Sequence, residues 1–180
     1  MIILGIDPGT RRIGYGIIEK ERSKLKMLAA GILKISAGGP LRQSSSEASG
    51  SASRGKRRAD DFGALQETKK QVEGLIKKFK PEVLAIEKLY FVKNQKTGLE
   101  VAEARGAIIL SALENNLAVK EYGPNEIKAG VAGYGLADKR AILKMVGLIL
   151  GTPDLRLIDD ASDALAVAIM AAQSSKIQPF

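Results

Sequence analysis

The stretch IILGIDPGTRRIGYGII, residues 2–18, begins with an apolar run that ends in a single acid, Asp7. The apolar run predicts a buried β-strand, and Pro8 and Gly9 favour a tight turn after it. Two interpretations of Asp7 are open at this point. It begins the turn, or it places a carboxylate at the carboxyl end of a core strand, where open α/β sheets bind their ligands.

The composition limits the chemistry that the chain can perform. Its 180 residues, 45% of them hydrophobic, are enough for the core of one domain, and the chain has neither Cys nor His. Disulfides, thiolate metal sites and Ser-His-Asp or Cys-His catalysis are thereby excluded, and any metal would be a hard cation. Since neither a secretory signal nor a membrane-spanning run is visible, we expect a cytoplasmic protein with no membrane partner.

The charge of the chain favours a polyanionic partner. There are 28 Lys and Arg against 20 Asp and Glu, which gives a formal net charge of +8 and a pI near 9.7. Binding of such a protein to phosphates releases condensed counterions, which favours association. Solvated lysines on helix surfaces are the simpler alternative.

The apolar pattern predicts one α/β domain. Apolar runs at 13–18 and 25–35 predict two more strands of an antiparallel meander, with the first strand in a central position. Residues 36–61 are rich in Ser and Gly and predict a flexible loop. Within this loop is a basic patch formed by Arg54, Lys56, Arg57 and Arg58. Two interpretations of the patch are open: it contacts DNA phosphates, or it is a solvated part of a flexible segment.

The second half of the chain alternates helices and strands. The spacing of apolar residues from Leu65 to Phe79 predicts a helix that Pro81 ends. The buried strand VLAIE, residues 83–87, then ends in a lone acid as the first strand does. Residues 97–116 predict a helix with two apolar faces, one with Leu99, Ala102, Ile109 and Leu113, the other with Val101, Ala104, Ile108 and Ala112. One face packs on the sheet and the other needs a second partner.

The last predicted helix follows a strand at 117–122, a short helix and a helix near 137–150. Its sequence, DDASDALAVAIMAAQ, carries three acids in the first turn. Asp160 and Asp163 share one helix face, whereas Asp159 points elsewhere. Acids in a first turn also favour the helix dipole, and this effect accounts for one acid more readily than for the pair.

Four carboxylates can therefore meet in one cluster: Asp7, Glu87, Asp160 and Asp163. Such a cluster repels itself unless divalent cations neutralise it, and with oxygen ligands alone Mg²⁺ or Mn²⁺ is the expected metal. Two ions would activate a water molecule and stabilise the leaving oxygen of a phosphodiester. A basic chain with an acidic, metal-binding cleft is typical of a nuclease.

Three segments, GIDPGTRRIGYGII, AIEKLYF and DDASDALAVA, resemble in order and spacing the motifs of the RuvC family of bacterial Holliday-junction resolvases. The resemblance covers nearly the whole chain. It implies a single RNase H-like nuclease domain over residues 1–180, with a mixed five-stranded sheet flanked by helices. Asp7, Glu87, Asp160 and Asp163 match the catalytic, metal-binding acids of the family, which implies Mg²⁺, or Mn²⁺ as the alternative, with two ions in each active site.

The implied activity is the resolution of four-way DNA junctions by paired symmetric nicks, in recombination and repair. Because two matched nicks are needed, we expect a homodimer, and branch-migration helicase subunits are further candidate partners. Lys128 and Lys139 match basic residues that contact DNA, and Tyr90 matches an aromatic position that stacks at the opened junction. The alternatives are ordinary surface lysines and core packing of Tyr90 or Phe91. The Ser-rich segment departs from the family, whose connection there is usually shorter.

Two other classes of protein remain as alternatives. The turn Asp-Pro-Gly-Thr at residues 7–10 resembles the phosphate-binding turn of actin-like ATPases and sugar kinases, but these proteins need two such lobes and 180 residues supply one. A non-catalytic RNase H-like protein in RNA processing or transcription is the second alternative. Such a protein would gain nothing from four acids that repel nucleic acid.

Overall fold

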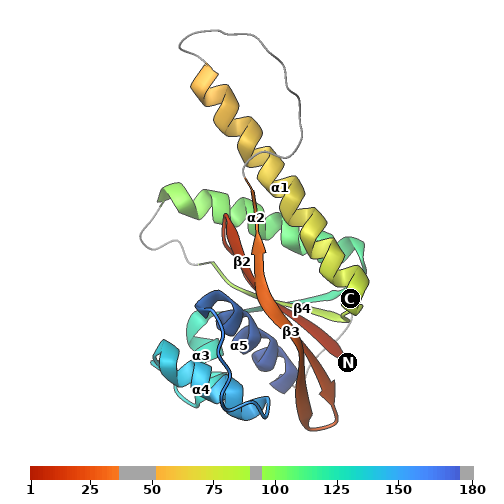
Figure 1. Cartoon of the computed structure of the whole chain (residues 1–180), viewed down its shortest axis with the longest axis vertical. Coiled ribbons are helices and arrows are strands. Elements are labelled where there is room, and N and C mark those ends of the chain that lie inside the picture. Colours follow the sequence, from red (N-terminus) through yellow and green to blue (C-terminus); the bar gives the residue numbers. More distant parts are fainter. Residues whose placement is uncertain (37–51, 90–94, 175–180) are drawn as a thin grey trace.

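A five-stranded sheet with helices on both faces forms the domain (Figure 1). The computed structural model describes the backbone of residues 1–36, 52–89 and 95–174, and the side chains of 1–36, 62–89 and 98–174. The elements, in chain order, are β1 (Ile2–Asp7), β2 (Arg12–Glu21), β3 (Lys24–Lys34), α1 (Ala52–Phe79), β4 (Val83–Glu87), α2 (Gln95–Glu114), β5 (Ala118–Tyr122), α3 (Pro124–Ala132), α4 (Lys139–Ile149) and α5 (Asp159–Gln173).

The strand order is β3-β2-β1-β4-β5, with β1 in the middle. The pairs β1–β2 and β2–β3 are antiparallel, and the pairs β1–β4 and β4–β5 are parallel. The predicted meander, the central first strand and the mixed five-stranded sheet are thus confirmed. Helices α1 and α2 lie on one face of the sheet, and α3, α4 and α5 lie on the other (Figure 1).

Helix α1 begins earlier than the sequence suggested. The predicted loop extends to residue 61, whereas the helix starts at Ala52. That prediction was wrong for residues 52–61, because their Ala, Arg and Lys residues favour helix, and the extension of an existing helix needs no new nucleus. Residues 37–51 of the predicted loop lie outside the described residues, as do the side chains of the basic patch.

Each face of the sheet has its own apolar core. Leu4 and Ile6 of β1 lie in one cluster with Ile108 of α2 and the apolar side chains of α1. Ile3 is one residue out of step and lies in the opposite cluster, with Leu165 of α5. This division follows from the two-residue period of a strand, which sends successive side chains to opposite faces.

Glycines on β1 and β2 allow α5 to lie directly on the sheet. A Cβ atom at Gly5 would lie 2.1 Å from the carbonyl oxygen of Ala164, and a Cβ atom at Gly14 would lie 1.9 Å from that of Asp160. A side chain fits in neither place. The first turn of α5 is therefore held against the start of β2.

Helix α2 packs mainly with one of its two apolar faces; on the other face Ile109 is half-buried against the same core. Ala104, Ile108 and Ala112 are buried, whereas Leu99 and Leu113 are exposed. The sequence left open which face meets the domain, and the structure shows that it is the face with Ile108.

Among the described residues, no helix combines the length and the apolar character that crossing a bilayer requires.

Candidate active site

Asp7 and Glu87 lie side by side at the carboxyl ends of two parallel strands. Ile6 of β1 is in register with Ile86 of β4, so each acid is the next residue on its strand. Asp7 is two residues beyond Gly5 and therefore points to the face that α5 covers. Glu87 has the same parity as Ala85, which belongs to the core on that face. Both carboxylates therefore face α5.

The first turn of α5 lies over the end of β1. Asp7 pairs with Gly14 across the β1–β2 ladder, and Gly14 is the residue against which the backbone of Asp160 packs. Asp163 follows one turn later on the same helix face. Strand register and helix packing thus bring together the four acids that the sequence singled out, and we call Asp7, Glu87, Asp160 and Asp163 the acidic cluster.

Burial and the charges of neighbouring carboxylates raise the pKa of Asp7, Glu87 and Asp163. Burial, followed by the charges of Glu87, Asp163 and Asp160, raises the pKa of Asp7 to about 7. The pKa of Glu87 is raised by burial and by the charge of Asp163, and the pKa of Asp163 is raised mainly by burial. The carboxylates therefore act on one another electrostatically, and the site favours a cation.

Two basic side chains form ion pairs at the open side of the cluster. Arg12 lies with Nε 3.1 Å and Nη2 3.0 Å from Oδ2 of Asp160. The Nζ atom of Lys139 lies 3.4 Å from Oδ2 of Asp163 and 3.5 Å from Oδ2 of Asp159. The charge of Asp163 is the main cause of the raised pKa of Lys139. Asp159 thus belongs to the rim, beside Lys139.

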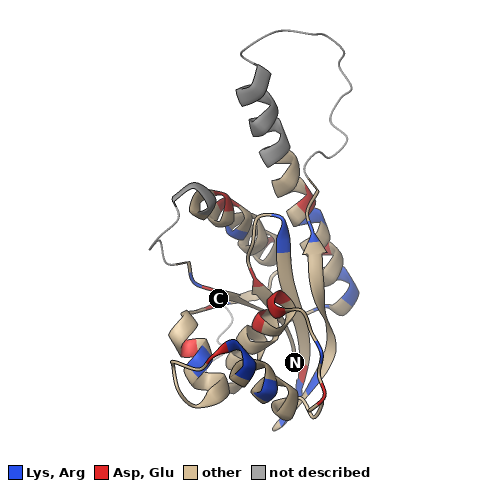
Figure 2. Ribbon diagram, turned by 60° about the vertical axis from the view of Figure 1, so that its left-hand side comes forward, with Lys and Arg blue, Asp and Glu red and all other residues tan. Residues whose placement is uncertain are grey.

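A pocket of about 220 Å³ opens beside the acidic cluster. Glu87 and Asp163 line it together with Lys128 of α3 and Lys139 of α4. Both lysines oppose the upward shift in the pKa of Glu87, so they act on the cluster electrostatically. Figure 2 shows acidic and basic positions together in the half of the molecule that holds α3, α4 and the start of α5. The structure thus places both predicted basic residues at the site.

The acidic cluster has the ligand chemistry of a hard divalent cation. All its side chains are carboxylates, which Mg²⁺ and Mn²⁺ prefer, and a cation would relieve the repulsion that contributes to the raised pKa of Asp7. Among the described residues, no three acidic side chains converge on one point as a bound ion requires. Arg12 holds Asp160 and Lys139 holds Asp163, and both carboxylates are partly exposed. Ion binding would therefore require side chains of the cluster to reorient, and it would compete with these two ion pairs.

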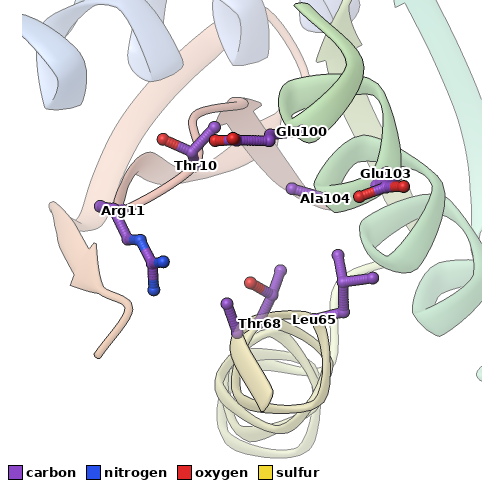
Figure 3. A pocket seen from close by; sticks show the side chains of 8 residues that line it. Thr10, Arg11, Leu65, Thr68, Glu100, Glu103 and Ala104 are labelled. Carbon is purple, nitrogen blue, oxygen red and sulfur yellow. The ribbon is translucent and has the colours of Figure 1, made fainter. Parts of the chain in front are cut away.

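The turn after Asp7 faces helices α1 and α2 across a small cavity on the opposite face of the sheet. Thr10 and Arg11 line a small cavity with Thr68 of α1 and with Glu100 and Ala104 of α2 (Figure 3). Its volume, about 20 Å³, suffices for a single water molecule rather than a ligand. Neighbouring arginines thus diverge, with Arg11 on this face and Arg12 at the acidic cluster.

Sequence reasoning missed two arginines that contact this site. The first is Arg12, which is two residues before Gly14 on β2. Alternate residues of a strand face the same side of the sheet, so Arg12 lies on the side that α5 covers. Arg105 of α2 donates a hydrogen bond from Nε to the backbone carbonyl of Glu87 at 3.2 Å and forms an ion pair with Glu121. No sequence motif identifies Arg105.

Tyr90, the aromatic residue predicted to contact DNA, lies outside the described residues.

The mixed sheet, its flanking helices and the carboxylates at the ends of two neighbouring strands define an RNase H-like domain. The family model described as crossover junction endodeoxyribonuclease RuvC matches residues 3–49 and 57–171. The chain belongs to the RuvC family.

Relatives and solved structures agree with this assignment. A crossover junction endodeoxyribonuclease RuvC from Natranaerobius thermophilus is 40% identical over 99% of this chain and 98% of its own length. The structure of RuvC from Thermus thermophilus is similar with a TM-score of 0.76 and 27% identity, over 96% of this chain and 93% of that one. The same protein in complex with a Holliday junction substrate is similar with a TM-score of 0.75 and 25% identity, over the same shares of the two chains.

Proposed function

We propose that this protein is an endonuclease that resolves four-way DNA junctions by paired, symmetric nicks in recombination and repair. The observation that carries the proposal is the acidic cluster, built from β1, β4 and α5 in a chain whose net charge is +8. An acidic site in a basic protein is the arrangement that metal-dependent phosphodiester hydrolysis needs. Membership in the RuvC family supports the same activity.

In this proposal the acidic cluster is catalytic. Asp7, Glu87, Asp160 and Asp163 would hold divalent cations, Mg²⁺ or alternatively Mn²⁺, with two ions in each site. Bound there, the cations supply an activated water molecule and stabilise the leaving oxygen. Asp159 is not one of the proposed ligands.

The basic residues around the cluster would bind and orient the DNA. Lys128 and Lys139 lie at the pocket beside Glu87, where their charges can hold the phosphates on either side of the scissile bond. Lys139 is paired with Asp163 in the structure, so cation binding to the acids would release it for a phosphate. We also assign a DNA contact to Tyr90, on the family resemblance alone.

A homodimer would supply the two active sites that two matched nicks require. The open face of α2 with Leu99 and Leu113 is apolar, and an isologous contact through it would relate two copies by a two-fold axis. Branch-migration helicase subunits are further proposed partners.

A synthetic four-way junction and a linear duplex of the same sequence test the function. The protein should nick the junction symmetrically in Mg²⁺, leave the duplex intact, and cleave neither substrate in the presence of a chelator. Binding of the junction without cleavage in Mg²⁺ or Mn²⁺ would contradict the proposal and favour a non-catalytic nucleic-acid-binding protein.

A further inference from the structure

The loop between α3 and α4, residues 133–138, presents two large apolar side chains to solvent. Tyr134 is 55% exposed and Leu136 is 89% exposed, the highest value among the large hydrophobic residues that the structure describes. Single exposed apolar residues are common on protein surfaces. Two on one short loop form a local apolar surface, which we call the apolar loop.

The apolar loop is fixed at both ends. Gly133 ends α3 in the left-handed conformation, with φ 83°, and its N–H donates to the carbonyl oxygen of Ala129 at 2.9 Å. Asp138 caps α4 by accepting a hydrogen bond from the N–H of Ala141 at 2.8 Å. Ala137, between the apolar residues and this cap, is completely buried. With its neighbour anchored in the core, Leu136 is held outward.

The position of the loop connects it with the proposed active site. Lys139, the residue directly after the Asp138 cap, contacts Asp163 of the acidic cluster. Lys128 lies on the helix that precedes the loop and lines the same pocket as Glu87. The apolar loop therefore borders the surface on which DNA would lie, with a lysine on each side of it in the sequence.

We propose that Tyr134 and Leu136 contact bases that are unstacked at the branch point of a DNA junction. This inference rests on the proposed function. The flanking Lys128 and Lys139 would attract phosphates, while the ring of Tyr134 can stack on an exposed base and Leu136 can press against an opened base step. Bases within a linear duplex are already stacked and offer neither contact. The loop would thus favour junctions over duplexes.

The test compares binding of a junction and of a duplex in the absence of divalent metal. The double variant Tyr134→Ala/Leu136→Ala should lose about five- to tenfold in junction affinity, measured by fluorescence anisotropy, and keep its affinity for the duplex. A 2-aminopurine base at the branch point should brighten when wild type binds, because it unstacks, and the variant should lose this signal. Leu148→Ala, an exposed leucine elsewhere on α4, is the matched control and should behave as wild type.

The melting temperature of the double variant should match that of wild type, since both side chains are exposed. Tyr134→Phe should keep the 2-aminopurine signal, because the ring stacks and the hydroxyl does not. The inference would be overturned if the double variant kept the junction affinity and the fluorescence change of wild type. It would also be overturned if the double variant lost affinity equally for the junction and for the duplex. If wild type itself does not distinguish junction from duplex, the proposed function fails together with this inference.

Discussion

Two nitrogens of Arg12, Nε at 3.1 Å and Nη2 at 3.0 Å, contact the same carboxylate oxygen, Oδ2, of Asp160. The pair joins the start of β2 to the first turn of α5, at the open side of the acidic cluster. Asp160 is one of the carboxylates that we propose as metal ligands. A guanidinium group and a divalent cation therefore compete for the same oxygen.

Removal of this competitor should strengthen metal binding. Arg12→Gln takes away both the ion pair and a positive charge near the cluster, and an exposed pair of this kind is worth about 0.2–1 kcal/mol. We expect up to about fivefold tighter Mn²⁺ binding by isothermal titration calorimetry. Arg22→Gln, in the turn between β2 and β3, is the control and should change nothing. Weaker Mn²⁺ binding in Arg12→Gln would show that Arg12 supports the site instead.

Neutralisation of Asp7 should stabilise the metal-free protein at high pH. The pKa of Asp7 is about 7 in the folded protein, against 3.8 as its ordinary value. Between these values the folded chain binds a proton that the unfolded chain does not, so stability falls as pH rises from about 4 to 7. Asn carries no charge and avoids this loss.

The melting temperature of Asp7→Asn in EDTA should therefore exceed that of wild type at pH 8 by a few degrees, since about 1 kcal/mol shifts it by about 2–4 °C. The difference should shrink as pH approaches 4. Asp159→Asn serves as the control, because that carboxylate is exposed on the rim. Equal melting temperatures of wild type and Asp7→Asn at pH 8 would mean that ionised Asp7 does not destabilise the folded protein, which would contradict its raised pKa.

A charge on the open face of α2 should dissociate the proposed dimer. Wild type should have about twice the chain mass of 19.2 kDa by light scattering, and Leu113→Glu should shift it to the monomer. Leu148→Glu, on α4, should remain dimeric. Ile108 is unsuitable for this test because its side chain is buried, and Glu there would disrupt the core. Wild type that resolves junctions as a monomer would refute the dimer.

The acidic cluster was predictable because its geometry follows from simple periodicities. An acid at the end of a buried strand keeps the parity of the strand, which fixes the face for Asp7 and Glu87. Asp160 and Asp163 share a helix face by their spacing of three. What the sequence could not supply was the register between β1 and β4 and the fit of α5 against Gly5 and Gly14.

The features that sequence analysis missed depend on long-range contacts. Arg12 and Asp160 are far apart in the chain, and their contact exists only because α5 lies on β2. The start of α1 was placed too late because the Ser- and Gly-rich composition before it conceals residues that favour helix. The face of α2 that packs depends on its partners, α1 and the sheet, since both faces are apolar.

Cleavage and binding of one junction by Asp7→Asn and Asp159→Asn test the central claim most directly. Both substitutions remove one negative charge near the start of α5, but only Asp7 belongs to the acidic cluster. In Mg²⁺, Asp7→Asn should bind the four-way junction as tightly as wild type or more tightly and should not cleave it, whereas Asp159→Asn should keep most of its activity. Junction cleavage by Asp7→Asn at a rate near that of wild type would contradict the account.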